Sequence, residues 1–170
     1  MTETTYWLGI GANIGDPRAQ MADAIRRIGD LSGTNVEAVA PLYKTPPWGI
    51  TDQPYFLNSA LAVSSDFAPL ALLGALKAIE MAMERVGGQR WGPRPIDLDI
   101  IAWSEGIFDN ERLHIPHARA HDRGFVLVPL ADLNDDLPLQ GNTVADLLSK
   151  ADTKGIERAA DANWHLATTD

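Results

Sequence analysis

Two carboxylates separated by a single residue are the strongest chemical signal in the sequence. Asp97 and Asp99 belong to residues 96–101, a stretch in which apolar and acidic residues alternate. Residues i and i+2 of a β-strand project from the same face, so the two carboxylates would lie side by side. Because neighbouring anions repel, either one is protonated or a cation lies between them. Oxygen ligands in a chain without cysteine favour Mg²⁺ over zinc, and a solvent-facing strand with two ordinary acids is the alternative.

Arginines are concentrated around this stretch. Arg90 and Arg94 flank a Gly-Pro turn, which would direct both guanidinium groups toward the same end of the strand. Six of the ten arginines lie between residues 85 and 123, where the acids also number six, so the net charge of −9 lies outside this span. Guanidinium groups match phosphate oxygens, and arginines beside a metal-binding carboxylate pair suit phosphoryl transfer. Surface salt bridging would explain the same enrichment.

Other catalytic and binding motifs do not fit the sequence. Residues 9–15 approach a dinucleotide fingerprint, but the third glycine comes one place too late, which favours a glycine turn before a helix. Neither a P-loop nor a G-x-S-x-G elbow is present. His114, His117 and His121 could suggest zinc, but Pro116 breaks the helix that their spacing would need. We expect phosphate-contacting or surface histidines instead.

Length and composition narrow the class of protein further. A chain of 170 residues with 45% hydrophobic and 22% charged residues can form a self-sufficient core, and we expect one domain over residues 1–170. The net charge of −9 repels nucleic acid at long range. No stretch approaches 18 uninterrupted apolar residues, and the N-terminus lacks a basic end followed by an apolar run. These features predict a cytoplasmic protein that binds neither nucleic acid nor membrane.

Apolar periodicity and turn residues predict the elements that would position these side chains. Strands are expected over residues 6–10, 36–43, 56–64 and 96–101, all on one antiparallel sheet. Helices are expected from Pro17, with Asp16 as N-cap, and from Pro69 to the Gly87-Gly88 pair. The order strand, helix, strand, strand, helix, strand is that of an α+β, ferredoxin-like split βαβ sandwich with helices on one face of the sheet.

Signals beyond residue 101 are weaker. Residues 104–106 are predicted to turn a hairpin that ends near Ile115. Residues 125–133 are predicted to be helical despite Pro129, and Thr143 to cap a short helix that ends at Lys150. No element is predicted after Asp152.

Four pieces of the sequence between residue 6 and residue 133 form a recognisable series. They are Gly11-Ala12-Asn13-Ile14-Gly15-Asp16; Tyr43-Lys44-Thr45-Pro46-Pro47 with Asp52-Gln53-Pro54-Tyr55-Phe56-Leu57-Asn58; Arg90-Trp91-Gly92-Pro93-Arg94-Pro95-Ile96-Asp97-Leu98-Asp99-Ile100-Ile101; and Ile115-Pro116-His117 with Arg123-Gly124-Phe125. In these residues and in their order, the chain resembles the 6-hydroxymethyl-7,8-dihydropterin pyrophosphokinase family, and the third piece fits the family signature throughout.

This resemblance implies a function and a set of site residues. The implied enzyme is a monomer that moves pyrophosphate from ATP onto a pterin alcohol in folate biosynthesis and releases AMP. Asp97 and Asp99 would be the ligands of two Mg²⁺ ions and, with Arg90 and Arg94, the catalytic residues. The remaining ATP contacts would be Glu80, Arg90, Trp91, Arg94, Ile100, Arg112, His117 and Arg123. The pterin contacts would be Thr45, Pro46, Trp48, Phe56, Asn58, Trp91 and Phe125, with Phe56 and Phe125 stacking on the two faces of the ring and Trp91 covering it.

The chain departs from the family pattern near the expected ATP lid. The family usually carries Gly-Arg and further basic residues after the long helix, whereas residues 84–89 here supply one arginine in a loop about one residue shorter. Lys77 stands where the family tends to have a neutral amide, and Ala118 where it has a larger residue. Two alternatives follow: a paralogue that binds pterin or nucleotide without transfer, and a metal-dependent nucleotidyl transferase that would release pyrophosphate instead of AMP.

Overall fold

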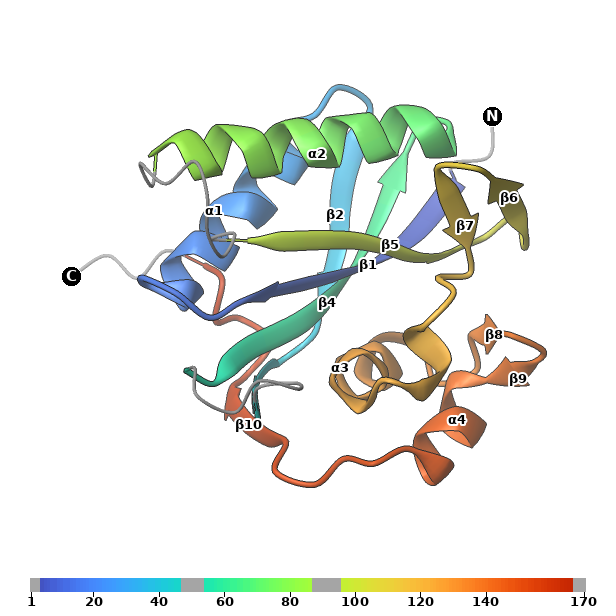
Figure 1. The fold of residues 1–170 in the computed structure, drawn as a ribbon. Helices are drawn as coiled ribbons and strands as arrows, with labels where there is room; N and C mark the ends of the chain where they lie inside the picture. The colour runs from blue at the N-terminus through green and yellow to red at the C-terminus, as the bar shows by residue number, and fades with distance from the viewer. Residues whose placement is uncertain (1–3, 47–53, 87–95, 167–170) are drawn as a thin grey trace.

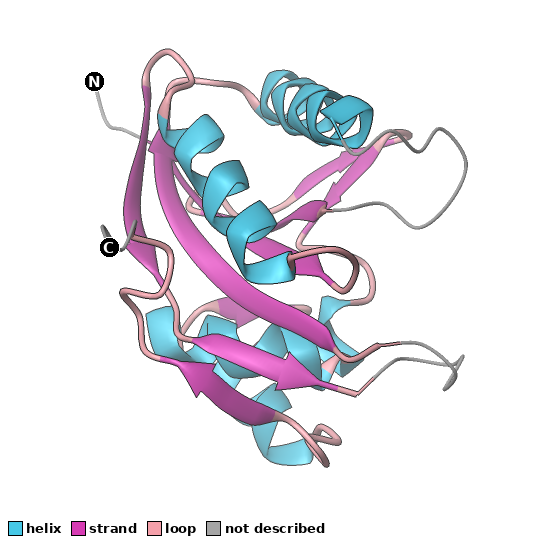
Figure 2. Cartoon of the chain, turned by 90° about the vertical axis from the view of Figure 1, so that its left-hand side faces the viewer, coloured by secondary structure: helices cyan, strands magenta, loops and turns pink. Residues whose placement is uncertain are grey.

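An antiparallel sheet between two layers of helices forms the molecule (Figures 1 and 2). The computed structural model describes residues 4–46, 54–86 and 96–166. In chain order, the elements are β1 (Thr4–Ala12), α1 (Pro17–Gly29), β2 (Thr34–Val39), β3 (Leu42–Thr45), β4 (Phe56–Ser65), α2 (Pro69–Val86), β5 (Asp97–Trp103), β6 (Phe108–Asn110), β7 (Leu113–Ile115), the 3-10 turn η1 (Ala120–Asp122), α3 (Gly124–Asn134), β8 (Pro138–Leu139), β9 (Asn142–Thr143), α4 (Val144–Lys150) and β10 (Glu157–Ala160).

The main sheet has β1 and β4 at its centre. Its strand order is β10-β3-β4-β1-β5, and β2 pairs with the far half of β4. All of these pairs are antiparallel. From one edge to the other, the strands are β5, β1, β4 and then β2 and β3, which pair with different halves of β4. This is the order of a split βαβ sheet, so the predicted ferredoxin-like fold is confirmed. Two short hairpins, β6-β7 and β8-β9, lie beside this sheet.

The two long helices begin at the prolines where their sequences predict, Pro17 and Pro69. Pro17 occupies the first turn of α1, and the side chain of Asp16 accepts a hydrogen bond from Ala19 N at 3.2 Å. The buried residues of both helices recur at helical spacing and face the sheet. In α1 they are Met21, Ala24, Ile25 and Ile28, and in α2 they include Leu72, Leu76, Ile79 and Met83.

Each face of the sheet carries its own apolar core. The alternate residues Tyr6, Leu8 and Ile10 of β1 are buried against α1 and α2. The opposite face packs against α3, where Leu127 and Leu130 are fully buried, and α4 packs on α3. The expected arrangement of helices on one face therefore describes α1 and α2 only, because the elements after residue 123 cover the second face. No helix in the described ranges is both long and apolar enough to cross a bilayer.

The predicted second strand, residues 36–43, is wrong as a single element. Ala40 still donates to Ala60 O at 2.9 Å, but Pro41 has no N–H, so the ladder stops and β3 begins at Leu42. The carbonyl of Ala40 instead accepts from Ser59 Oγ at 3.0 Å and from Trp164 Nε1 at 2.9 Å. The carbonyl of Ala40, freed by this interruption, thus binds the side chain of Trp164.

Two further expectations differ from the structure. The hairpin that ends at Ile115 turns at residues 111–112, between β6 and β7, and the bend at residues 104–106 only leads the chain out of β5. The segment after Asp152 contains β10, which pairs with β3. Its residues Glu157, Arg158 and Ala159 are all exposed, so no alternation marks this strand in the sequence. The predicted helices over residues 125–133 and 144–150 are confirmed, and Thr143 Oγ1 caps the second by accepting from Asp146 N.

Candidate active site

Two glycines in β1 form the floor of a cavity on the α3 face of the sheet. Gly11 lies between Asn58 of β4 and Asp97 of β5, and Gly9 lies opposite Asp99. A Cβ on Gly11 would stand 2.4 Å from Asn58 Oδ1, so a side chain larger than hydrogen would displace that amide. The glycines therefore leave open the space between the carboxylates on one side and the amide on the other.

Asp97 and Asp99 project from the same face of β5, as predicted. Both are exposed at the cavity, whereas the alternate residues Leu98 and Ile100 are buried against the α1 and α2 side of the sheet. The strand period thus places two carboxylates in one hollow and two apolar side chains in the core. Adjacent carboxylates of this kind attract a cation rather than an anion.

The amide of Asn58 is held in a fixed orientation across the sheet. Its Nδ2 donates to Thr45 Oγ1 at 2.8 Å, and Thr45 is only 2% exposed. With Nδ2 directed at Thr45, Oδ1 is the atom that faces Gly11. The pair offers a planar, oriented hydrogen-bonding group, which suits the edge of a flat polar ring.

The start of α3 closes the cavity from the other side. The guanidinium carbon of Arg123 lies 5.8 Å from the ring centroid of Phe125, a cation–π contact that leaves the charge at the cavity. The cavity has a volume of about 210 Å³. Its lining comprises Gly9, Ile10, Gly11, Thr45, Pro46, Phe56, Asn58, Ser59, Asp97, Asp99, Ile101, Arg123, Phe125 and Val126.

His117 is attached to β5 beside the carboxylates. Its backbone N–H donates to Ile101 O at 2.8 Å, and its Nδ1 accepts from Arg119 N at 3.1 Å. Burial lowers the pKa of the imidazole below its ordinary value, the charge of Asp99 opposes this, and Arg123 adds to it. A neutral ring whose Nδ1 accepts carries its proton on Nε2, so His117 can donate a hydrogen bond to an anion without adding a full charge.

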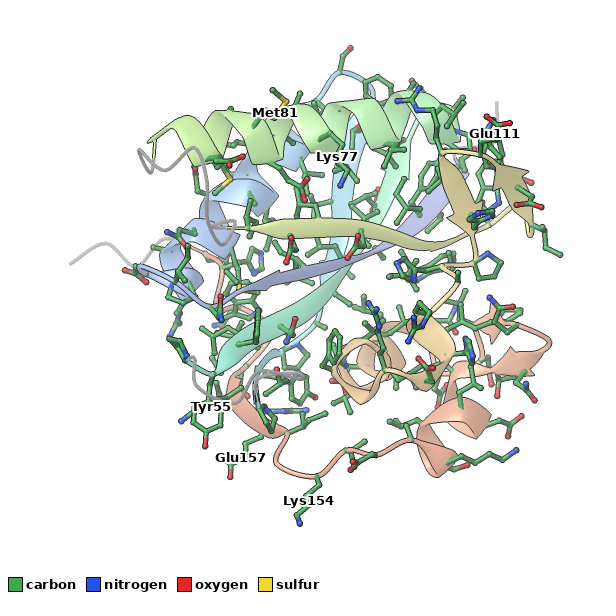
Figure 3. The ribbon with its side chains drawn as sticks, in the orientation of Figure 1. Tyr55, Lys77, Met81, Glu111, Lys154 and Glu157 are labelled. Atoms are coloured by element: carbon green, nitrogen blue, oxygen red, sulfur yellow. The ribbon has the colours of Figure 1, made fainter. Side chains whose placement is uncertain are left out.

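Glu80 of α2 reaches the opposite edge of β5. It is 4% exposed, and its Oε2 accepts from Leu98 N at 2.8 Å, while Lys77 Nζ lies 3.2 Å from Oε1. Lys77 extends from α2 toward β5 (Figure 3). Leu98 separates the two aspartates, so this buried carboxylate holds the backbone of the segment that carries them.

Among the described residues, the structure brings most of the expected contacts together. Eight residues predicted from the resemblance line the one cavity, and they are Thr45, Pro46, Phe56, Asn58, Asp97, Asp99, Arg123 and Phe125. Glu80 contacts the strand rather than the cavity, the side chain of Ile100 is buried in the core, and Arg112 is exposed at the β6-β7 turn. Trp48, Arg90, Trp91 and Arg94 lie outside the described residues, as do most of the loops after β3 and α2.

Sequence reasoning missed several residues of the cavity. Ile101 and Val126 add apolar surface, and Gly9 leaves the floor flat opposite Asp99. The glycines could have been found from their spacing, because Gly9 and Gly11 at i and i+2 mark one face of a strand without side chains. Ile101 could have been found from the same period, because it continues the face of Asp97 and Asp99, whereas the contact of Val126 depends on how α3 packs and has no local signal.

The residues present fit a hard divalent cation. Asp97 and Asp99 supply oxygen ligands on one face, and Mg²⁺ is typically bound by one or two carboxylates together with substrate phosphates and water. Within residues 4–46, 54–86 and 96–166, no group of three or more His, Cys, Asp or Glu side chains could hold a metal ion. A carboxylate pair of this kind would need further ligands from a substrate.

A second hollow, of about 720 Å³, lies at the other end of β5. Its walls are mainly apolar and include Trp7, Trp103 and Phe108. The two ionisable side chains that line it, Asp109 and His114, are hydrogen-bonded to each other. The smaller cavity, which contains the carboxylate pair and the oriented amide, is therefore the better candidate for chemistry.

Comparison with known proteins agrees with this geometry. The family model for 7,8-dihydro-6-hydroxymethylpterin-pyrophosphokinase (HPPK) matches residues 7–135. A Methylorubrum extorquens protein named 2-amino-4-hydroxy-6-hydroxymethyldihydropteridine pyrophosphokinase is 45% identical over 155 residues, which cover 91% of this chain and 98% of the relative. A Pseudomonas aeruginosa protein of the same name is 43% identical over 157 residues, which cover 92% of this chain and 97% of the relative.

Solved structures share the fold. HPPK-DHPS from Plasmodium falciparum has a TM-score of 0.69 at 16% identity, over 88% of this chain and 43% of that one. An HPPK-DHPS solved in complex with substrates has a TM-score of 0.72 at 12% identity, over 93% of this chain and 48% of that one. The present chain spans less than half of those longer chains. Its sequence match and its fold together show that it belongs to the 7,8-dihydro-6-hydroxymethylpterin-pyrophosphokinase family.

Proposed function

We propose that the chain transfers pyrophosphate from ATP to the hydroxymethyl group of 6-hydroxymethyl-7,8-dihydropterin and releases AMP, as a step of folate biosynthesis. One observation carries this proposal: the carboxylate pair and the oriented amide of Asn58 share one cavity, separated by the bare backbone of Gly11. A ring held at Asn58 would place its substituent toward Asp97. The names of the bacterial relatives support the same reaction.

The pterin would occupy the part of the cavity between β3, β4 and α3. The Asn58 amide, fixed by Thr45, would bond the polar edge of the ring. Phe56 and Phe125 would supply its two stacking faces, and Pro46 would close one side. Trp48 and Trp91 are proposed as further contacts on the basis of the resemblance.

The triphosphate would lie along β5. Asp97 and Asp99 would hold two Mg²⁺ ions, which when bound neutralise phosphate charge and orient the phosphates. Arg123 and the Nε2–H of His117 would donate hydrogen bonds to phosphate oxygens. Arg90, Arg94 and Arg112 would add further contacts to the phosphates. Glu80 and Ile100, expected as ATP contacts, are proposed here to shape the β5 edge where the nucleotide would bind.

The transfer itself requires positioning more than proton removal. The hydroxymethyl oxygen attacks the β-phosphorus, and the bond from that phosphorus to the oxygen bridging the α- and β-phosphates breaks, so AMP leaves with the bridging oxygen. The proton of the alcohol passes to water as the new bond forms, and in a loose transition state the nucleophile keeps its proton until late. We therefore assign no general base, and the cationic groups stabilise the charge that develops on AMP.

Product analysis tests this function. The protein is mixed with ATP, Mg²⁺ and reduced 6-hydroxymethylpterin, and AMP and pyrophosphate are measured separately. Pterin-dependent AMP release supports the proposal. Release of pyrophosphate would instead support a nucleotidyl transferase, and binding of both substrates without either product would support a binding paralogue; each result contradicts pyrophosphate transfer.

We also propose that the chain acts as a monomer in the cytoplasm. The bacterial relatives match over nearly their whole lengths, which is consistent with an enzyme of this size acting alone. Light scattering of the active protein measures the mass in solution, and a mass twice that of the 18.5 kDa chain would contradict the monomer.

A further inference from the structure

The chain after α4 runs behind both walls of the cavity. Residues 151–160, here called the C-terminal strap, pass the start of α3 and then join the sheet as β10 beside β3 (Figure 1). Lys154 and Glu157, on either side of Gly155, point away from the body of the protein (Figure 3). The side of the strap opposite these two side chains therefore faces the body of the protein.

The first contact is with α3. A Cβ built on Gly124 would stand 2.4 Å from Asp152 O and 3.4 Å from Ile156 Cδ1. The backbone of the strap thus lies directly against the first residue of α3, which has no side chain to separate them. Gly124 lies between Arg123 and Phe125, and both of these residues line the cavity.

The second contact is with the residue that follows β3. Gly155 has a φ of +81°, and a Cβ built on it would stand 2.7 Å from Pro46 Cγ. Pro46 lines the cavity beside Thr45. The strap is therefore packed against one residue at each of the two walls that face the Asn58 amide.

Weaker contacts hold the strap in register. Glu157 pairs with Lys44 and Arg158 with Tyr43 across the β10-β3 ladder. The hydroxyl of Tyr43 donates to Asp132 of α3, and Arg158 lies 3.9 Å from the same carboxylate. Because the side chain of Arg158 is 53% exposed, its ion pair contributes little, and the strap is held by the β10-β3 ladder and by the close packing at Gly124 and Gly155.

We propose that the C-terminal strap is a positioning element of the pterin pocket, which sets the distance between Pro46 and the start of α3 that carries Phe125. This inference rests on the proposed function only for the identity of the ligand. It assigns a role in substrate binding to residues 151–160, which lie outside the cavity and touch no reacting atom.

Gly155→Ala and Gly106→Ala form a matched pair of variants for the test. Both glycines have a positive φ, +81° and +91°, so alanine is disfavoured at both positions. A Cβ at Gly155 meets Pro46, whereas a Cβ at Gly106 meets nothing within 4 Å. The difference between the two variants therefore reports the contact with Pro46 rather than the strain.

In steady-state kinetics, the two variants should differ in the KM for the pterin. We expect Gly155→Ala to raise the KM for the pterin about tenfold, with the KM for ATP changed less than about twofold, since small displacements of positioning groups cost up to about 100-fold. Gly106→Ala should leave both constants near wild type. Equal pterin KM values in the two variants, or equal rises in pterin and ATP KM for Gly155→Ala, would overturn the proposal.

Hydrogen exchange keeps the test independent of activity and of the proposed reaction. In the free protein, the amides of residues 44–45 and 124–127 should exchange faster in Gly155→Ala than in wild type. Their exchange rates should be unchanged in Gly106→Ala. Should Gly155→Ala fail to fold, Ile156→Ala is the second variant, because it removes the side chain that lies against Gly124. We expect it to raise the pterin KM about threefold, a smaller effect of the same kind.

Two outcomes contradict the role of the strap: unchanged hydrogen exchange in Gly155→Ala, or an unchanged pterin KM in Ile156→Ala. A wild-type protein that forms no AMP contradicts only the proposed function.

Discussion

The carboxylate of Glu80 accepts a hydrogen bond from the backbone N–H of Leu98 at 2.8 Å. Leu98 is the residue between Asp97 and Asp99, and its N–H lies on the edge of β5 that faces away from β1. A side chain from α2 therefore completes the bonding of an edge strand at the point where that strand carries its two acids. Helix and strand are joined here by a buried, charge-assisted hydrogen bond, one of the stronger kinds of polar contact.

Removing this acceptor should affect both stability and turnover. Glu80→Ala leaves a buried N–H without its partner, so we expect the free energy of unfolding to fall by about 1 to 3 kcal/mol. Glu80→Gln keeps an acceptor oxygen and should lose less. Urea denaturation measures the stabilities, and AMP formation measures turnover. If Glu80→Ala has the wild-type free energy of unfolding and the wild-type turnover, the hydrogen bond to Leu98 does not position β5.

Neutralising either cavity aspartate should abolish most of the activity without unfolding the protein. Asp97→Asn and Asp99→Asn retain the size of the side chain and remove one charge from an exposed position. We expect turnover to fall at least about 100-fold, and the free energy of unfolding to change by less than about 0.5 kcal/mol. The control is Asp109→Asn, at an exposed acid in the second hollow. Near-normal turnover in either cavity variant would refute a role in metal binding.

The hydrogen bond from Asn58 to Thr45 should matter for the pterin and little for ATP. Thr45→Val is isosteric and removes only the acceptor of Asn58 Nδ2. We expect the pterin KM to rise about fivefold, which corresponds to about 1 kcal/mol, the usual value of one such bond. Thr34→Val is a matched control, because it removes a buried hydroxyl bonded to Ser65 Oγ far from the cavity. If both variants shift the pterin KM equally, Thr45 does not orient the amide.

The folded state should lose stability in mild acid through His165. Burial lowers the pKa of His165 below its ordinary value of 6.5, so the unfolded state binds a proton more readily than the folded state. His165 therefore adds to stability above pH 6.5, and this contribution is lost as the pH falls below that value. Urea denaturation of wild type and His165→Gln between pH 5 and pH 7.5 measures the effect. The difference between the two proteins should grow with pH and level off near neutrality; a constant difference would contradict it.

Local sequence patterns were sufficient where one period governs an element. The alternation over residues 96–101 predicted both the strand and the shared face of Asp97 and Asp99, and the capping pair Asp16 and Pro17 predicted the start of α1. The cavity then followed from topology, because the split βαβ order places β5, β1 and β4 side by side. The roles of the residues within it stay predictions.

Contacts that depend on distant packing had no such signal. The break at Pro41 matters because Trp164, more than 120 residues later in the chain, bonds the freed carbonyl of Ala40. The strand β10 has no buried alternation and is recognisable only by its pairing with β3. Glu80 could be named from the family resemblance, but its bond to Leu98 depends on how α2 docks on the sheet edge.

The alternation along β5 also limits how this part of the gene can vary. A shift of β5 by one residue against β1 would turn Leu98 and Ile100 toward the cavity and drive two carboxylates into the apolar interior. Catalytic competence and the ability to fold would then disappear in a single step. Variation in length should therefore be tolerated in the connecting loops and rejected within the strand itself.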